Sequence, residues 1–183
     1  MSNEPTNGSL FETIRPVVVL VSICMVASGL LGAVHNLTDP IAQANAQAKA
    51  HEIYASLVPS AKDFVEVECS VEGCTAALEA RDAAGDVVAY VIVAESKGYG
   101  GQVPIAVAFA PKGTVKAITA MSNDETPGLG TKIANESYIG QYVGKPAQAL
   151  TADDVDLISG ATISSKAALA AFDIAVEAYE EVH

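Results

Sequence analysis

The sequence is poor in basic residues, with only 10 Lys and Arg against 22 Asp and Glu in 183 residues. The net charge of −12 at pH 7 gives the protein a field that repels phosphate backbones. This charge balance argues against nucleic acid as a partner. The chain is long enough for one domain and a little more, which excludes a second catalytic domain.

Common cofactor motifs are also missing. The sequence contains neither G-x-G-x-x-G after a strand nor G-x-x-x-x-G-K-[ST], so it supports neither a dinucleotide-binding fold nor a P-loop. Its three His residues are scattered and lack the spacing of a metal-ligand set. There is no internal repeat and no low-complexity linker.

Cysteine is scarce, with three residues in the chain. Cys69 and Cys74 form a C-x₄-C pair around a turn that Gly73 could supply, and in an oxidising compartment such a pair can close a disulfide. Half of a zinc site is the alternative, but no second Cys or His pair exists to complete it. The pair also lacks the further cysteines of an iron–sulfur cluster.

Apolar residues make up 50% of the sequence, and they are concentrated near the N-terminus. Residues 16–34 contain no charge and would span about 28 Å as a helix, which predicts one transmembrane helix. A secretory signal peptide is the competing interpretation, but the apolar run is longer than an ordinary signal core and no clean A-x-A site follows it.

The basic residues that flank this span are few, with Arg15 before it and Lys49 as the first one after it. Residues 1–15 are the better candidate for a cytoplasmic tail. We therefore expect the remainder of the chain on the extracytoplasmic side of the membrane.

The rest of the chain has the pattern of an α+β domain, in which strands are followed by helices. Thr38 or Asp39 as N-cap and Pro40 as first helical residue predict a helical connector within 35–62. A small antiparallel sheet follows, and helical segments at 131–142 and 163–182 end the domain 63–183. The expected strands are 63–69, 74–81, 86–96, 103–110 and 114–122.

Three segments, each after an expected strand, are rich in glycine and small polar residues: 97–101 (KGYGG), 125–132 (ETPGLGTK) and 156–165 (DLISGATISS). Glycine lets the backbone come close to a flat or anionic ligand. Any one of these segments alone is better explained as a turn. Three in one small domain indicate a binding site.

The third segment leads directly into the long C-terminal helix. A helix N-terminus offers unpaired N–H groups and a partial positive charge, so it would stabilise a phosphate on Thr162. The other interpretation is that Thr162 or Ser159 only caps the helix, which is the usual role of such residues.

These three segments resemble the motifs of a known family, the FMN-binding domains. Residues 156–162 are similar to its D-x-x-[ST]-G-A-T motif, residues 125–130 to its ETPGLG signature, and residues 97–101 to the glycine-rich stretch that precedes it. The resemblance covers most of the chain. Within the family it is strongest to the G-type subunits of Rnf electron-transport complexes, with the C-type subunits of the sodium-pumping NADH:quinone reductases as relatives.

The resemblance implies that a flavin transferase, using FAD and a magnesium ion, attaches FMN to Thr162 through a phosphoester bond. It implies contacts of the 126–130 loop with the flavin ring, hydrogen bonding or bracing by Glu125 and a positive charge from Lys132. For Tyr99 it leaves two roles open, stacking on the ring and a purely structural one. Asn123 and Asp124 depart from the family pattern, which leaves contacts from there in doubt. The expected cofactor-binding residues are Tyr99, Gly100, Glu125, Thr126, Gly128, Leu129, Gly130, Lys132, Ser159, Gly160, Ala161 and Thr162.

The same resemblance implies an electron-transfer subunit with covalent FMN as its only cofactor. Its partners would be the other membrane subunits of a complex that couples ferredoxin and NAD redox chemistry to sodium or proton translocation. A single uncharged span provides no ion path of its own. The alternatives are a component of a quinone reductase, a flavoprotein serving a separate extracytoplasmic reductase, and a membrane-tethered scaffold without flavin.

Overall fold

The computed structural model describes the backbone of residues 7–183 and the side chains of residues 14–32, 35, 38 and 47–183. It contains two units, an N-terminal one that ends at Ala50 and a second one, His51–His183, that holds the sheet and all later helices. We describe each unit by itself.

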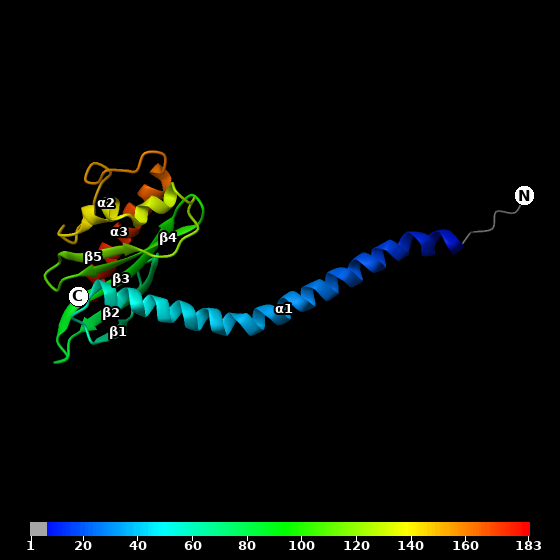
Figure 1. The fold of residues 1–183 in the computed structure, drawn as a ribbon, viewed down its shortest axis with the longest axis horizontal. Helices are drawn as coiled ribbons and strands as arrows, with labels where there is room; N and C mark the ends of the chain where they lie inside the picture. The colour runs from blue at the N-terminus through cyan, green and yellow to red at the C-terminus, as the bar shows by residue number, and fades with distance from the viewer. Residues whose placement is uncertain (1–6) are drawn as a thin grey trace, which may run out of the picture. The chain divides into compact units, whose positions relative to one another are not determined.

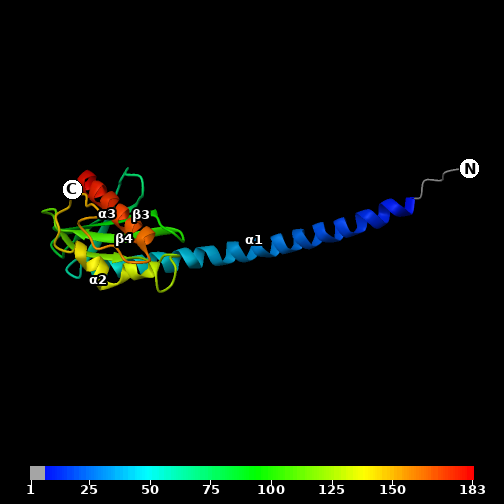
Figure 2. The same cartoon turned by 90° about the horizontal axis from the view of Figure 1, so that it is seen from above.

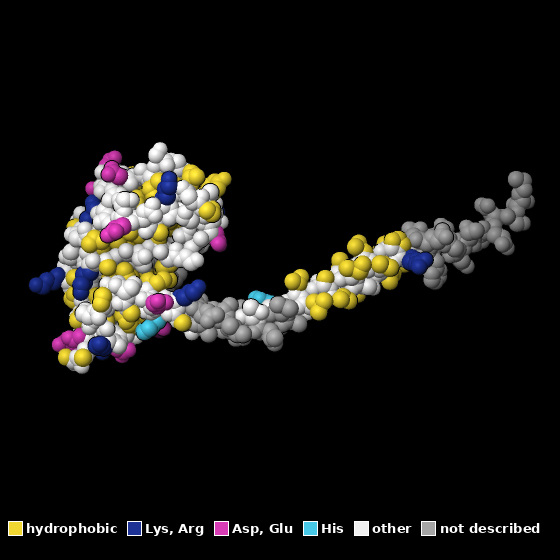
Figure 3. Space-filling model, in the orientation of Figure 1, with side chains coloured by type: hydrophobic (Ala, Val, Ile, Leu, Met, Phe, Trp, Pro, Cys, Tyr) yellow, Lys and Arg dark blue, Asp and Glu magenta, His cyan; other side chains and the backbone are white. Residues whose placement is uncertain are grey.

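The N-terminal unit is part of one long helix, α1 (Asn7–Leu57). Its segment Ile14–Gly32 is long and apolar enough to cross a membrane, and none of its side chains is buried. Figure 3 shows apolar side chains along this part of the helix. An apolar surface of this length has no protein core to cover it here, as expected of a helix that faces lipid.

The helix start that we expected at Thr38 or Asp39 is wrong, because α1 continues through these residues to Leu57. Proline removes one backbone hydrogen bond from a helix and need not end it when good helix formers lie on both sides. The helical connector is therefore continuous with the predicted span.

The sheet of the second unit is an antiparallel meander in the order β1-β2-β3-β4-β5, as the sequence predicted (Figure 1). Its strands are β1 (Asp63–Val67), β2 (Cys74–Arg81), β3 (Val87–Lys97), β4 (Gln102–Phe109) and β5 (Val115–Ala120). Each pairs with the next along the chain, so hairpins alone build the sheet. The observed ends lie within two residues of the predicted ones.

Helix α3 (Thr162–Val182) packs on one face of the sheet, and the last turns of α1 lie on the other (Figure 2). The buried side of α3 includes Leu169, Phe172, Val176 and Tyr179, the face that its sequence predicted. The Phe109 ring lies 4.7 Å from that of Tyr179 and 6.3 Å from that of Phe172. Because both faces of the central strands are covered, they carry nearly continuous apolar runs.

The predicted helical segment 131–142 forms three short pieces: η1 (Gly130–Ala134), α2 (Glu136–Ile139) and η2 (Gly140–Tyr142). Asn135 is extended, with ψ near 139°, and it interrupts the helix.

The C-x₄-C pair, whose spacing permits a disulfide, consists of two free thiols in this structure. For the alternative zinc site, the described residues contain no group of three or more His, Cys, Asp or Glu side chains that could hold a metal.

Candidate functional site

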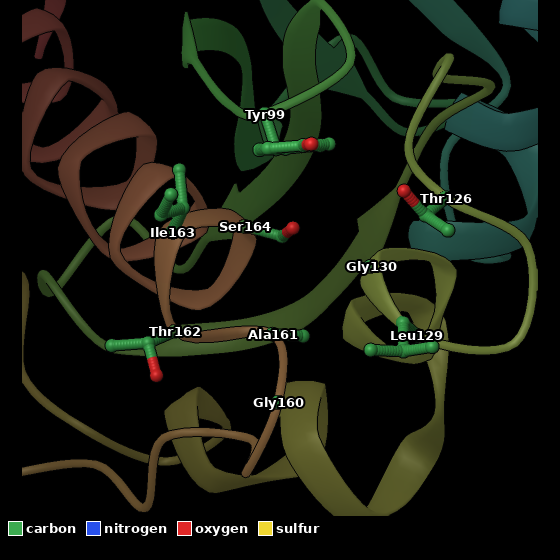
Figure 4. A pocket seen from close by; sticks show the side chains of 9 residues that line it. All are labelled: Tyr99, Thr126, Leu129, Gly130, Gly160, Ala161, Thr162, Ile163 and Ser164. Atoms are coloured by element: carbon green, nitrogen blue, oxygen red, sulfur yellow. The ribbon is translucent and has the colours of Figure 1, made fainter.

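A hollow of about 470 Å³ opens at the N-terminal end of α3. This volume lies in the usual range for small-molecule sites. Figure 4 shows Thr126 and Leu129 facing the first turn of α3 across the hollow, with Tyr99 on a third side. The three glycine-rich segments therefore meet in space. The lining residues are Tyr99, Thr126, Leu129, Gly130, Gly160, Ala161, Thr162, Ile163 and Ser164.

Thr162 is the first residue of α3, and its side chain is exposed. Ala161 occupies the N-cap position, and no side chain caps the helix. The interpretation of Thr162 or Ser159 as a cap is therefore wrong. The N–H groups of the first turn have no intrahelical acceptors, so the Thr162 hydroxyl stands beside free donors and the positive end of the helix dipole.

Three large apolar side chains around the hollow are unusually exposed. Tyr99 is 72% exposed, Ile163 56% and Leu129 46%. A cluster of exposed apolar groups around a concave site is typical of a surface that a ligand covers.

A buried carboxylate joins the walls of the hollow. Glu125 is only 3% exposed, and one of its oxygens accepts hydrogen bonds from the N–H groups of Tyr99 (2.8 Å) and Gly100 (3.0 Å). Its other oxygen accepts a hydrogen bond from the Ser164 hydroxyl at 2.5 Å. Glu125 thus connects its own loop to the 97–101 loop and to the first turn of α3.

Two glycines are required because the backbone lies so close to this carboxylate. A Cβ atom on Gly98 would overlap Glu125 Oε1, and one on Gly130 would lie 2.6 Å from Glu125 Oε2 and 2.8 Å from Ser164 Oγ. No side chain fits so close to another atom. These glycines let the backbone close around Glu125, and Gly130 also lines the hollow.

The hydrogen bonds keep Glu125 ionised. Burial raises the pKa of this carboxyl, but the Ser164 hydroxyl and the N–H groups of Gly100 and Tyr99 stabilise the charged form more strongly, and the net pKa is lowered. The site therefore contains a fixed negative charge whose hydrogen-bonding capacity is used by the protein itself.

A second buried serine fixes the segment that leads into α3. The Ser165 hydroxyl accepts a hydrogen bond from the N–H of Ile158 (3.1 Å) and donates to the carbonyl of Ala161 (2.9 Å). The Tyr138 hydroxyl donates to the Ser165 carbonyl at 2.8 Å. These bonds hold the turn before Thr162 against the helix.

Seven of the twelve predicted site residues line the hollow: Tyr99, Thr126, Leu129, Gly130, Gly160, Ala161 and Thr162. Glu125 and Gly100 lie behind its wall and are joined by the hydrogen bond described above. Gly128, Lys132 and Ser159 do not line it.

Three further residues of this region, Ile163, Ser164 and Ser165, were not among the predicted site residues. Ile163 is an apolar residue off the buried face of α3, and two consecutive serines in the first turn of a helix are poor helix formers. Both features were available in the sequence as signals of a special role.

The residues present suit a ligand with an anionic group and a flat apolar body. The first turn of α3 provides N–H donors and the Thr162 hydroxyl for the anion, while Tyr99, Leu129 and Ile163 provide apolar surface. FMN has both parts, a phosphate and a ring system, and the hollow therefore fits it.

Comparison with known proteins agrees with this chemistry. Residues 98–177 match the FMN-binding domain family. The chain is 30% identical to the G subunit of the proton-translocating ferredoxin:NAD(+) oxidoreductase complex of Clostridium ljungdahlii, over 97% of this chain and 95% of that protein. It is 31% identical to the G subunit of the ion-translocating oxidoreductase complex of Methanosarcina acetivorans, over 91% of this chain and 94% of that protein.

Among solved structures, NqrC of Shewanella oneidensis aligns with a TM-score of 0.49 and 19% identity, over 67% of this chain and 70% of that chain. The two sequence relatives match over nearly their whole length, and both are G subunits of such complexes. The chain belongs to the family of G subunits of ion-translocating oxidoreductase complexes, and it contains that family's FMN-binding domain.

Proposed function

We propose that this protein is a membrane-anchored electron-transfer subunit that carries FMN in a phosphoester bond to Thr162. The observation that carries the proposal is the position of the Thr162 hydroxyl. It is exposed, it lies on the first turn of α3, and it borders the hollow in which all three glycine-rich segments meet.

Attachment requires an acceptor oxygen that an enzyme can reach. A flavin transferase supplies FAD, the Thr162 oxygen forms a bond to the FMN phosphorus, AMP leaves and the hydroxyl proton is released. The first-turn N–H groups of α3 then stabilise the phosphate charge. This local field matters because the protein as a whole carries a net charge of −12 and would repel an anion.

The apolar residues of the hollow hold the ring system. Tyr99, Leu129 and Ile163 remove apolar surface from water when the ring lies against them. Glu125 keeps the backbone of Tyr99 and the first turn of α3 at fixed positions, so the walls are preorganised before FMN arrives. The flavin supplies the one- and two-electron chemistry, and the protein orients it and excludes water.

The membrane segment and the relatives define the setting of this chemistry. The segment Ile14–Gly32 anchors the domain, and the partners are the other membrane subunits of an oxidoreductase complex like those of the relatives. The domain faces the extracytoplasmic side, where a released FMN could not readily be replaced, which favours a covalent bond. In such a complex, ferredoxin and NAD redox chemistry is coupled to proton or sodium translocation through the other subunits.

In-gel flavin fluorescence of the full-length protein, expressed together with a flavin transferase, tests the attachment. The wild-type band should fluoresce on a denaturing gel, and Thr162→Ala should be dark but still folded and membrane-bound. Thr114→Ala, an exposed threonine that does not line the hollow, is the matched control and should keep its fluorescence. A fluorescent Thr162→Ala band, or a dark wild-type band, would contradict the proposal.

A further inference from the structure

The C-terminal end of α3 contacts a second chemically unusual feature, the loop 68–73 between β1 and β2. Cys69 lies at the start of this loop, and Cys74 directly follows it as the first residue of β2. Both side chains are partly buried, and both line one hollow beside the ends of β1 and β2. Two thiols that line one hollow across a short loop are placed for a bond between their sulfur atoms.

The loop is held in place on two sides. Its Gly73 carbonyl accepts a hydrogen bond from the N–H of Glu95 at 2.8 Å, which joins it to β3. The Glu181 carboxylate on α3 accepts hydrogen bonds from the N–H of Ser70 at 3.1 Å and from the Cys69 thiol at 3.7 Å. Because both ends of the loop are fixed by other elements, both cysteines are held beside the same hollow without a disulfide.

The two thiols differ in reactivity. Burial first, and then the neighbouring Cys69, raise the pKa of the Cys74 thiol to about 12. Cys74 is therefore a thiol at neutral pH and a poor first nucleophile. Cys69 is therefore the residue that would start an exchange reaction.

We propose that Cys69 and Cys74 form a dithiol–disulfide site, which is oxidised in the membrane-bound protein by exchange with the disulfide of a thiol–disulfide oxidoreductase. Cys69 forms a mixed disulfide as the oxidant's sulfur–sulfur bond breaks and one of its sulfurs leaves as a thiol. The Cys74 sulfur then displaces the oxidant's second sulfur. Two S–H bonds are lost, one S–S bond forms, and the oxidant takes up two electrons and two protons.

Oxidation would join the two sulfurs by a covalent bond and keep the loop at the end of α3. The structure holds the reduced form, with the residues of both flanking strands already in register. The oxidised form requires an oxidising compartment, so this inference rests on the side of the membrane proposed above and not on the flavin.

Thiol counting on full-length protein in its native membrane tests the inference. Cells are quenched in acid, and the denatured protein is treated with a maleimide polymer, with or without prior reduction. Of the three cysteines, one should react without reduction and all three after it. Three reactive cysteines without reduction would overturn the proposal.

Two further measurements identify the pair. A tryptic peptide from Asp63 to Arg81 contains both cysteines and no internal Lys or Arg, so it should be lighter by two hydrogen atoms before reduction. Cys69→Ser and Cys74→Ser should each leave two reactive cysteines with or without reduction, while Cys24→Ser, the matched control, should change from none to two. If reduction increased the number of reactive cysteines in either single variant, Cys69 and Cys74 would not be each other's partners.

Flavin fluorescence read on the same gel separates this inference from the proposed function. Reduced cysteines in a fluorescent band would overturn the disulfide alone. A disulfide in a dark band would support the dithiol–disulfide site and contradict the flavin proposal.

Discussion

The hydrophobic core and the N-terminal end of α3 bury opposite kinds of residue. In the core, Phe109, Phe172 and Tyr179 are buried, as apolar residues in proteins usually are. At the N-terminal end of α3, polar Glu125, Ser164 and Ser165 are buried instead, while apolar residues at the surface line the hollow.

This difference in burial shows what the polar and the apolar residues of each region do. Buried polar groups are stable only when they are hydrogen-bonded, and each hydrogen bond specifies a backbone position. The exposed apolar side chains around the hollow contribute little to folding, and a bound ligand would remove them from water. Core variants should therefore act through stability, and site variants through flavin seating.

The largest effect on stability is expected for Phe172→Ala in the core. Phe172 is fully buried, and removing its ring should destabilise the domain by about 3–5 kcal/mol. Its flavin should be lost only in the fraction that fails to fold. Thermal unfolding and in-gel fluorescence measured on one preparation would check this. A stable but flavin-free variant would contradict the expectation that core variants act through stability.

An intermediate effect is expected for Glu125→Gln, which keeps the shape and removes the charge. The amide cannot accept all the hydrogen bonds that the carboxylate accepts, so we expect a loss of about 1–3 kcal/mol at pH 7 and weaker flavin loading. Asp124→Asn, at the exposed neighbouring position, is the matched control and should leave both properties unchanged.

The pH dependence of this variant gives a second readout. The pKa of Glu125 is lowered by folding, so its contribution to stability is present above its ordinary value of 4.5 and is lost as the pH falls further. The difference in free energy of unfolding between wild type and Glu125→Gln should therefore shrink below about pH 4.5. A difference that is constant down to about pH 3 would show that the charge of Glu125 has no role.

The smallest effect on stability is expected for Ile163→Ser. Its side chain is 56% exposed, so unfolding should change by less than about 0.5 kcal/mol, while the flavin absorption spectrum or its reduction potential shifts. Val143→Ser, an exposed apolar residue away from the hollow, is the control. Identical flavin properties in both variants would place the ring elsewhere.

Much of the fold could be predicted from local patterns. The strands alternate or are continuously apolar, and the face of α3 that includes Leu169 and Phe172 has the period of a helix, so each element was visible in its own segment. The start of a helix at Asp39 was predicted wrongly because local cap signals say nothing about a helix that already exists before them.

The site was predictable only in part, because its assembly depends on long-range contacts. The motifs located the three segments and Thr162, but the hydrogen bond of Ser164 to Glu125 joins residues 39 positions apart. Nothing in either segment alone specifies it. The composition of the glycine-rich segments predicted room for a ligand, but it gave no sign that Gly98 and Gly130 also make room for this carboxylate.

The central claim is the bond between FMN and Thr162, and mass spectrometry of the protein isolated from its native membrane tests it most directly. The tryptic peptide that ends at Lys166 contains this threonine. We predict that its mass is increased by one FMN less one water, and that fragmentation places the addition on Thr162. The same peptide found only in unmodified form would contradict the account.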